Sequence, residues 1–158
     1  FFSKKTHDLI NFDYSEYILK NIDKSRNKGI ELRYKWNNKF SLGSLLARLQ
    51  NPIDNKNLLL PRRSKKSISV NFYKDFKDLS ININLSAFDR RKDFNDKALP
   101  GYSVLNLSLN KKVSKYIDLS LRFENLLNKE YFTAAAYNGY YRNQDRTIWL
   151  NLNYILRR

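Results

Sequence analysis

Cysteine and methionine are both absent from this chain of 158 residues, and histidine occurs once, at His7. Without cysteine the chain has no disulfide framework, no thiolate metal site and no thiol nucleophile. A metal site made of several histidines is excluded, and a Ser-His-Asp triad would have to be built around His7 alone. We therefore expect no catalytic residue, no metal site and no cofactor, which means that the chain is not an enzyme.

Long apolar runs are also missing from the sequence. No stretch of about 18 apolar residues could form a membrane-spanning helix, and Lys4, Lys5 and Asp8 interrupt the first segment, where a signal peptide would lie. A membrane protein made of strands stays open, because a spanning strand needs only about 9–11 residues with every second one apolar. Because the chain begins at Phe1 and contains no Met, we expect it to be a segment of a longer protein.

Alternation of apolar and polar residues with a period of two recurs along the chain. In the segment 79–87, for example, Ile81 and Ile83 alternate with Asn82 and Asn84. Such alternation predicts a β-strand with two different faces. Five further segments carry the same pattern: 29–36, 66–72, 102–110, 116–125 and 147–156.

Three weaker segments, 8–12, 16–21 and 40–49, complete a prediction of about nine antiparallel strands. The third of them loses its alternation near Leu45 and Leu46, which indicates either a β-bulge or a half-buried stretch there. None of the three shows the sustained apolar stripe that a helix would need.

The connections between these segments alternate between short and long. The short ones lie at 37–39, 74–77 and 111–115, and the long ones lie at 50–65, 89–100 and 127–145. Short turns at one rim and long loops at the other are typical of bacterial outer-membrane barrels, which have the turns in the periplasm and the loops outside. The last strand would then run inward and end in the periplasm.

Two folds produce this alternation: a soluble sheet with one wet face, and a barrel in lipid with a wet lumen. The apolar faces favour the barrel, because Leu, Ile, Val and Phe fill them without polar interruption and the longest strands reach about ten residues, against about 5–6 in soluble proteins. We therefore predict an all-β fold, namely an antiparallel transmembrane β-barrel segment that forms part of a barrel wall. In the isolated wall the apolar positions should stay exposed, and they include Ile81, Leu107, Leu119, Leu121, Leu150 and Leu152.

Positive charge dominates, with 30 Lys and Arg against 15 Asp and Glu and a net charge of +15. Basic clusters at 62–66 and 90–92 fall in the predicted outer loops, where they are solvated charge or contact lipopolysaccharide phosphates or an anionic ligand. Nucleic-acid binding would need basic residues among exposed aromatics on one sheet face. Because Asp118, Arg122 and Glu124 mix the signs on one strand, we expect no nucleic-acid partner.

The last third of the chain carries a motif that resembles a known family. The segment 125–131, Asn-Leu-Leu-Asn-Lys-Glu-Tyr, is similar to the Asn-Leu-Phe-Asp-Lys-x-Tyr segment that ends the penultimate strand of TonB-dependent outer-membrane receptors. Arg146 precedes a ten-residue alternating strand, as an arginine does in that family. We take Asn125, Leu126, Tyr131 and Arg146 as the family motif.

Further segments extend the resemblance to nearly the whole chain. Lys-Gly-Ile-Glu-Leu at 28–32, Leu-Pro-Arg-Arg at 60–63 and Pro-Gly-Tyr at 100–102 resemble successive strand openings of the same barrel, in the family's order. Compact loops and Asp-Leu-Ile at 8–10 are most similar to the cobalamin receptors. The final strand is similar to the family's assembly signal, although Leu156 stands where Phe is usual. We assign this signal to Leu150, Leu152, Tyr154 and Leu156.

The resemblance implies that residues 1–158 are the C-terminal part of a receptor barrel in the bacterial outer membrane, without the N-terminal plug domain. It implies active uptake of a scarce nutrient such as cobalamin or a metal chelate, for example a siderophore complex. The implied partners are outer-membrane lipid and lipopolysaccharide, the barrel assembly machinery, TonB through the absent N-terminal part, and a small-molecule ligand. No substrate-binding residue is implied.

Two alternatives stay open at this point. A self-contained small outer-membrane barrel could have a structural or adhesion role, because about 150 residues suffice for eight spanning strands with loops. The predicted odd number of strands argues against it. A soluble basic β-sheet protein that binds a partner is the other alternative.

Overall fold

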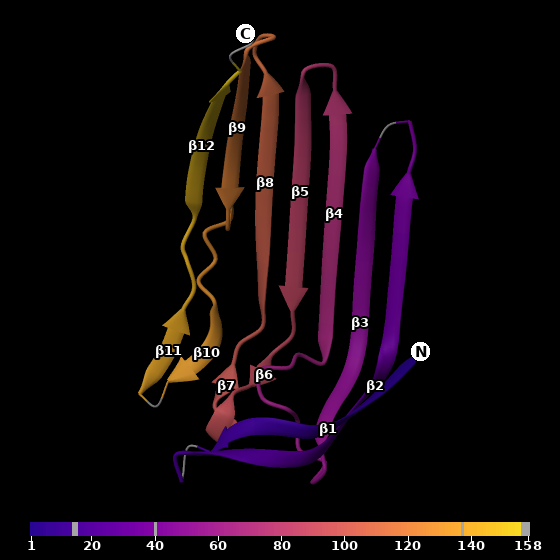
Figure 1. Cartoon of the computed structure of the whole chain (residues 1–158), viewed down its shortest axis with the longest axis vertical. Coiled ribbons are helices and arrows are strands. Elements are labelled where there is room, and N and C mark those ends of the chain that lie inside the picture. The colour runs from indigo at the N-terminus through magenta and orange to yellow at the C-terminus, as the bar shows by residue number, and fades with distance from the viewer. Residues whose placement is uncertain (14–15, 40, 137, 156–158) are drawn as a thin grey trace.

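The computed structural model describes residues 1–13, 16–39, 41–136 and 138–155, and it shows an all-β fold (Figure 1). Eight strands form one antiparallel sheet in the order β1-β2-β3-β4-β5-β8-β9-β12. Their bounds are Phe2–Asp13 (β1), Ile18–Asn37 (β2), Leu42–Asp54 (β3), Lys66–Phe76 (β4), Leu79–Phe88 (β5), Tyr102–Lys112 (β8), Ile117–Glu124 (β9) and Thr147–Tyr154 (β12). The sheet is therefore a meander, and we call it the wall.

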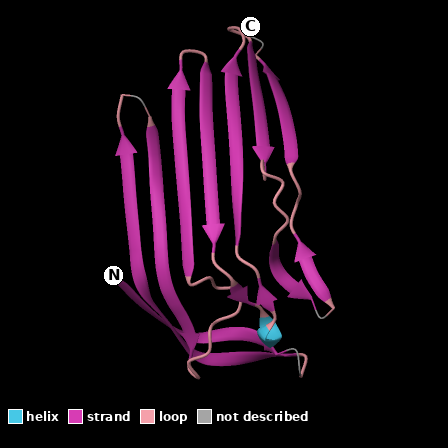
Figure 2. Ribbon diagram, turned by 180° about the vertical axis from the view of Figure 1, so that it is seen from behind, coloured by secondary structure: helices cyan, strands magenta, loops and turns pink. Residues whose placement is uncertain are grey.

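The loops contain the remaining elements. They are the strand pair β6 (Arg91–Lys92) and β7 (Ala98–Leu99), the strand pair β10 (Phe132–Ala136) and β11 (Gly139–Arg142), and the 3-10 turn η1 (Phe94–Asp96). Figure 2 shows η1 in cyan among the loops. Over the described ranges, no helix is long and apolar enough to cross a membrane.

Connections at the two ends of the wall differ in length, as the sequence predicted. Short turns follow β2, β4 and β8, and long loops follow β3, β5 and β9. All the short turns lie at one end of the wall and all the long loops at the other (Figure 1). We call these ends the turn rim and the loop rim.

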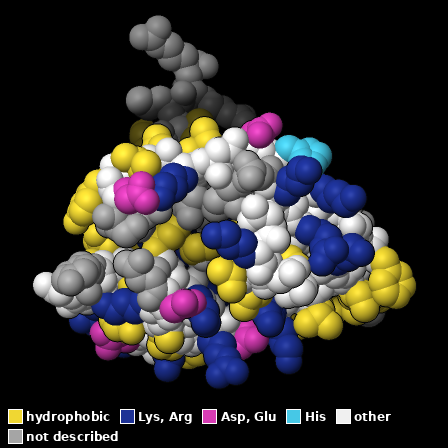
Figure 3. Space-filling view, turned by 90° about the horizontal axis from the view of Figure 1, so that it is seen from below, with side chains coloured by type: hydrophobic (Ala, Val, Ile, Leu, Met, Phe, Trp, Pro, Cys, Tyr) yellow, Lys and Arg dark blue, Asp and Glu magenta, His cyan; other side chains and the backbone are white. Residues whose placement is uncertain are grey.

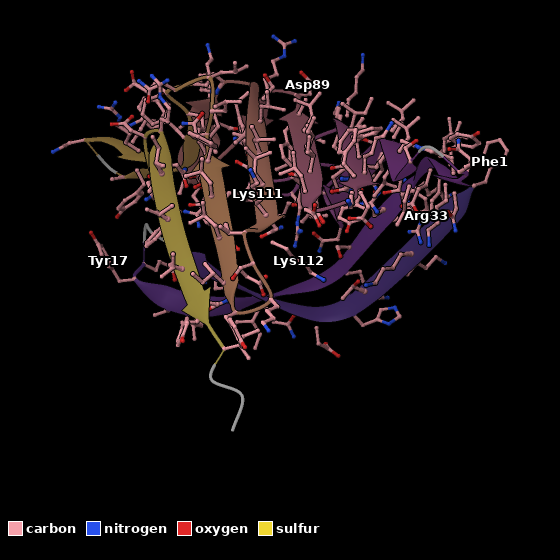
Figure 4. The ribbon with its side chains drawn as sticks, turned by 90° about the horizontal axis from the view of Figure 1, so that it is seen from above. Phe1, Tyr17, Arg33, Asp89, Lys111 and Lys112 are labelled. Atoms are coloured by element: carbon pink, nitrogen blue, oxygen red, sulfur yellow. The ribbon has the colours of Figure 1, made fainter. Side chains whose placement is uncertain are left out.

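The register of the wall places apolar residues of neighbouring strands side by side. Ile83 of β5 pairs with Phe72 of β4 and with Leu107 of β8, and Leu107 pairs with Phe123 of β9. Because cross-strand partners point to the same face, every second residue of each strand belongs to one face. The wall therefore has an apolar face and a polar face, and side chains leave it on both sides (Figure 4).

The apolar rows form a belt across the wall. The belt begins near the loop rim with the row of Ile30 and Leu49, and it ends near the turn rim with the row of Leu79 and Leu119. Lysines belong to both of these outermost rows, Lys66 beside Leu49 and Lys111 between Leu79 and Leu119. Five steps of two residues separate these rows, which is about 33 Å along a strand at about 3.3 Å per residue. A tilt of about 40° reduces this height to about 25 Å, the height of the apolar band of outer-membrane barrels.

No second layer covers the belt in the part of the chain that the structure describes. Leu150 and Leu152 are 70% and 63% exposed, as predicted. The other predicted positions are half-buried, because strands flank them on both sides; they are Ile81, Leu107, Leu119 and Leu121. The apolar face thus remains open to the surroundings, as a face in contact with lipid must be.

Buried apolar side chains are found near the loop rim instead. Leu99 is fully buried, and Ile53 and Val104 are nearly so. Leu99 belongs to β7, while Ile53 and Val104 lie at the loop-rim ends of β3 and β8. Within the described residues, close packing therefore holds the loops together and does not support the wall.

The structure corrects the predicted strand count from about nine to eight in the wall. Residues 18–21 of the segment 16–21 and the whole segment 29–36 belong to one strand, because β2 runs unbroken through 20 residues from Ile18 to Asn37. Of the two explanations for the lost alternation at Leu45 and Leu46, the bulge is wrong, since β3 pairs with β2 and β4 without a register shift. The half-buried stretch is confirmed, since residues 44–48 are half-buried. The alternation weakens there because Leu46 is an apolar residue at a polar-face position, between Arg33 of β2 and Ser69 of β4. On the apolar face, Gly43 lies beneath the Trp36 ring, where a Cβ would lie 2.0 Å from the ring.

Hydrogen bonds between side chains join the strands on the polar face. Asn84 Nδ2 donates to Asn71 Oδ1 at 2.6 Å, and Asn71 Nδ2 donates to Ser44 Oγ at 3.4 Å. Closer to the loop rim, Arg48 Nε donates to the carboxylate of Glu31 at 3.0 Å. Such pairs suit a water-filled lumen, where polar side chains can satisfy one another across strands.

Candidate functional site

The three long loops meet at the carboxylate of Asp93, which lies in the loop after β5. Arg62, from the loop after β3, donates from Nε to Asp93 Oδ1 at 2.7 Å. The N–H of Phe94 donates to the same oxygen at 2.8 Å, and the N–H of Ala135, in the loop after β9, donates to Oδ2. The Asp93 side chain is only 1% exposed. One buried carboxylate therefore ties all three loops, and we call this cluster the loop hub.

The environment of Asp93 favours its charged form. Burial acts to raise the pKa of the carboxyl, but the hydrogen bonds from Arg62, Ala135 and Phe94 and the charge of Arg62 outweigh burial. The pKa of Asp93 therefore lies below its usual range, and the loop hub is ionised at neutral pH. The Arg62 guanidinium also lies over the Phe94 ring, 4.9 Å from its centroid.

Two more basic side chains hold the loops together. Arg91 donates from Nη2 to the backbone oxygen of Phe132 at 2.8 Å and lies over the Tyr102 ring. Lys97 donates from Nζ to the backbone oxygens of Ala136 and Gly139, each at 3.0 Å. The predicted basic clusters at 62–66 and 90–92 are thus partly structural, because Arg62 and Arg91 are committed to contacts within the loops.

Asn125 of the family motif organises the loop that follows β9. Its residue is 2% exposed, and its backbone adopts a positive φ of 49°, which Asn tolerates better than most residues. Its side chain accepts from the N–H of Lys129 and donates to the backbone oxygens of Lys129 and Gln144, at 2.9, 2.9 and 3.2 Å. Its own N–H donates to Asn106 Oδ1 at 2.9 Å. Asn125 therefore fixes how the chain leaves the wall.

Replacement of Asn125 by Ala should destabilise this loop by about 2–3 kcal/mol, because buried backbone groups lose their partners. Asn125→Gly is the matched control, since Gly adopts the positive φ freely but makes no side-chain hydrogen bond. Amide hydrogen exchange at Lys129 measures the effect. Faster exchange in both variants is expected, whereas wild-type exchange in the Gly variant would show that only the backbone conformation matters.

The remaining motif residues lie around this loop but do not converge on one cavity. The N–H of Leu126 donates to the backbone oxygen of Leu105 at 2.8 Å. Tyr131 stacks on Tyr102 with ring centroids 4.5 Å apart, and burial, with a smaller contribution from Tyr102, raises the pKa of Tyr131. Arg146 is exposed, and its N–H donates to Asn128 at 2.9 Å. The motif therefore shapes a loop.

The predicted assembly signal lies on the other side of the wall, at its edge. Leu150, Leu152 and Tyr154 share the apolar face of β12, each more than half exposed. Leu156 lies outside the described residues.

Among the residues that the structure describes, no group of His, Asp and Glu side chains is placed to hold a metal ion. Sequence reasoning missed Asp93, since a lone Asp in a loop carries no pattern.

An open antiparallel sheet with a lipid-height apolar belt, a hydrogen-bonded polar face and tied loops at one rim defines a wall segment of an outer-membrane β-barrel. The family described as "TonB dependent receptor-like, beta-barrel" matches residues 1–126. The chain belongs to this family, whose members lie in the bacterial outer membrane. The relatives are transporters and receptors and not enzymes, as the sequence predicted.

Sequence and structure comparisons agree on the fold. The "Vitamin B12 transporter BtuB" of Vibrio cholerae serotype O1 is 27% identical over 158 residues, which cover 95% of this chain and 25% of that protein. The ferric yersiniabactin uptake receptor FyuA of Yersinia pestis matches 96% of this chain and 26% of that chain, with a TM-score of 0.76 and 19% identity. The copper transporter OprC matches 95% of this chain and 26% of its own chain, with a TM-score of 0.77 and 17% identity. The chain thus spans about a quarter of the length of these relatives.

Proposed function

We propose that this chain is the C-terminal part of the barrel wall of a TonB-dependent transporter that takes up a scarce nutrient across the outer membrane. The observation that carries the proposal is the wall itself: an apolar belt of bilayer height on one face and a polar face on the other. TonB would act through an N-terminal part of the parent protein, and the small-molecule ligand would pass along the polar face. Outer-membrane lipid, lipopolysaccharide and the barrel assembly machinery are its further partners.

Cobalamin is the nutrient we favour. Support comes from the vitamin B12 transporters of Vibrio cholerae and Vibrio vulnificus, which are 27% and 28% identical to this chain. Structures at 19% identity or less, such as the yersiniabactin receptor and the copper transporter, support the fold alone. A metal chelate is the second nutrient class to test.

Uptake by the complete receptor that contains this chain tests the proposal. The receptor is expressed in a strain that lacks its own cobalamin receptor, with and without TonB, and labelled cyanocobalamin and a ferric siderophore are supplied separately. Saturable cobalamin uptake that requires TonB is expected. Siderophore uptake alone would overturn the choice of nutrient, and the absence of any TonB-dependent uptake would overturn the proposal.

A self-contained small barrel is the alternative that the strand count newly favours. The wall has eight strands among the described residues, and an eight-stranded outer-membrane barrel is the smallest known size. However, β1 and β12 are the two ends of the sheet order and do not pair with each other. An open wall needs further strands to close in lipid, so the receptor segment remains the better proposal.

The assignment of the assembly signal predicts a defect when β12 loses its apolar edge. Tyr154→Ala should lower the amount of folded receptor in the outer membrane several-fold, because recognition of the last strand would depend on its apolar face. Asn153→Ala, on the opposite face of the same strand, is the control and should leave that amount unchanged. Heat-modifiable gel migration of outer-membrane fractions provides the measurement. Equal losses in both variants would contradict the assignment.

A further inference from the structure

The first two strands extend far beyond the apolar belt. β2 has 20 residues, about twice the 9–11 that span a bilayer, and β1 pairs only with its outer half, from Ile18 to Gly29. The pairing of β2 with β3 ends at Ser25, and the part of β2 beyond it runs with β1 across the loop rim (Figure 1). The side chains of this outer half can therefore contact molecules at the outer surface of the membrane.

Basic side chains gather on one face of this extension. Lys24, Arg26 and Lys28 follow Ile30 at every second position, so they continue the apolar face of the wall. Lys5 is the cross-strand partner of Arg26, and His7 is the partner of Lys24, which places both on the same face. Figure 3, seen from the loop rim, shows Lys and Arg side chains beside the single histidine.

These residues line a groove of about 390 Å³. Lys5, His7, Lys24 and Arg26 form one side of it, and the loop after β3 adds further polar side chains, including Asn55 and Asn57. We call it the basic groove. The basic groove has room for a phosphate group, and hydrogen-bond donors line it on several sides.

The basic side chains of the groove form no ion pair with the carboxylates of the described residues. Lys5, Lys24 and Arg26 are exposed, and no ion pair joins them to an acidic side chain among the described residues. Asp54 also lines the groove, but its Oδ1 accepts the N–H groups of Lys56 and Leu58 and so closes its own turn. In this the groove differs from the loop hub, where Arg62 is paired with Asp93.

An apolar hollow lies next to the basic groove, where the extension meets the belt. It has a volume of about 610 Å³. Lys28, Ile30 and Leu49 line it from the apolar face, and Phe2, Gly29 and Gln50, at the alternate positions, also line it. The apolar belt begins in this hollow, and the basic residues begin one row further out. Phosphate-binding groups therefore stand directly above a surface that suits acyl chains, on the lipid side of the wall.

We infer that the basic groove and the apolar hollow together bind a phosphorylated glycolipid of the outer leaflet, namely the lipid A part of lipopolysaccharide. The inference rests on the proposed orientation, in which the loop rim lies outside the cell. Lysine and arginine bind phosphate through charge-assisted hydrogen bonds, and clustered basic residues at a membrane surface attract anionic lipid headgroups. A nutrient in the lumen would meet the polar face instead, where Glu31 offsets Arg33 and Arg48.

Lipid binding by the complete receptor in detergent tests the inference. The variant replaces Lys5, Lys24 and Arg26 by Gln, and the control replaces Lys77, Lys112 and Lys115 by Gln at the turn rim. Fluorescent bisphosphorylated lipid A, the same lipid without phosphates, and inorganic phosphate are the three probes. Lipid A affinity should fall about tenfold or more in the variant and stay unchanged in the control.

Three results would overturn the inference: equal losses in variant and control, equal binding of the lipid without phosphates, or displacement of lipid A by inorganic phosphate at comparable concentration. Cobalamin uptake, measured on the same variants, keeps the two proposals apart. Absence of TonB-dependent uptake by the wild-type receptor, together with lipid A binding that falls in the variant as expected, counts against the proposed function alone. Intact uptake with lipid A binding insensitive to the substitutions counts against this inference alone.

Discussion

Replacement of Ile83 by Arg is expected to destabilise the folded barrel by about 2–4 kcal/mol, the cost of a cation on the lipid face near the middle of the bilayer. Ile83 occupies the fourth of the six apolar rows, between Phe72 and Leu107, on one of the central strands of the wall. An arginine there has no carboxylate within the belt to pair with and lies far from both rims. The effect should therefore exceed that of any polar-face substitution at the same depth.

Asn82→Arg provides the matched control, because Asn82 is the preceding residue of β5 and lies exposed on the polar face. Unfolding of the complete receptor by urea in lipid vesicles gives the two free energies. A loss of less than about 1 kcal/mol is expected for the control, since the lumen is wet and tolerates charge. If Asn82→Arg were the damaging change and Ile83→Arg were tolerated, the faces of the wall would be assigned the wrong way round.

Removal of the Asp93 carboxylate should make the three long loops open more easily. Asp93→Ala leaves Arg62 and the N–H groups of Phe94 and Ala135 without their acceptor. Hydrogen bonds to a charged group contribute about 1.5–3 kcal/mol each, and the partly exposed Arg62 recovers some solvation, so we expect opening of the loops to become easier by about 3 kcal/mol. Limited proteolysis after β9 and hydrogen exchange at Ala135 measure this opening.

Asp96 is the control for the loop hub, because it belongs to the same loop but its side chain is 83% exposed and pairs with Lys92 at the surface. Asp96→Asn should change loop exchange little, because Asn tolerates the positive φ of 59° at this position and exposed ion pairs contribute about 0–1 kcal/mol. Equal protease sensitivity in the two variants would show that Asp93 does not hold the loops.

The loop hub also predicts a pH dependence with a definite sign. Since the pKa of Asp93 is lowered in the folded protein, its contribution is complete above the ordinary Asp pKa of about 3.9. The contribution is lost only as the pH falls through the lowered folded pKa. Exchange at Ala135 should therefore be protected at pH 7 and pH 5 and lose protection below about pH 4. In Asp93→Ala this acid-dependent step should be absent.

The wall could be predicted from the sequence because lipid and water impose their contrast at every second residue. The segment 79–87 and the strand Leu79–Phe88 differ by one residue, since Ile81, Ile83 and Leu85 face the belt while their neighbours are Asn and Ser. The hairpin of β1 and β2 was predicted poorly. Its outward positions hold Lys and Arg instead of aliphatic residues, so the alternation that identifies a strand in lipid is lost beyond Ile30.

Of the candidate sites, the sequence indicated one and missed two. Asn125 was singled out by its place in a local motif, and the structure adds the hydrogen bonds that its side chain makes. Asp93 had no such motif, because Arg62 and Ala135 lie 31 and 42 residues away and meet it only in the folded loops. The basic groove was missed for another reason. Lys24 and Arg26 are separated by a neutral residue in the sequence and become a cluster only when β1 pairs with β2.

Cysteine scanning along β9 tests the central claim most directly. The chain contributes no native thiol, so single cysteines at positions 118–124 of the complete receptor can be labelled in membranes by a water-soluble, bilayer-impermeant maleimide and by a lipid-soluble reagent. Cysteines that replace Leu119, Leu121 and Phe123 should react with the lipid-soluble reagent only. Cysteines that replace Ser120 and Arg122 should react with the water-soluble reagent. A reactivity that does not alternate, or that alternates with the opposite phase, would contradict the assignment of this chain as the wall of an outer-membrane barrel.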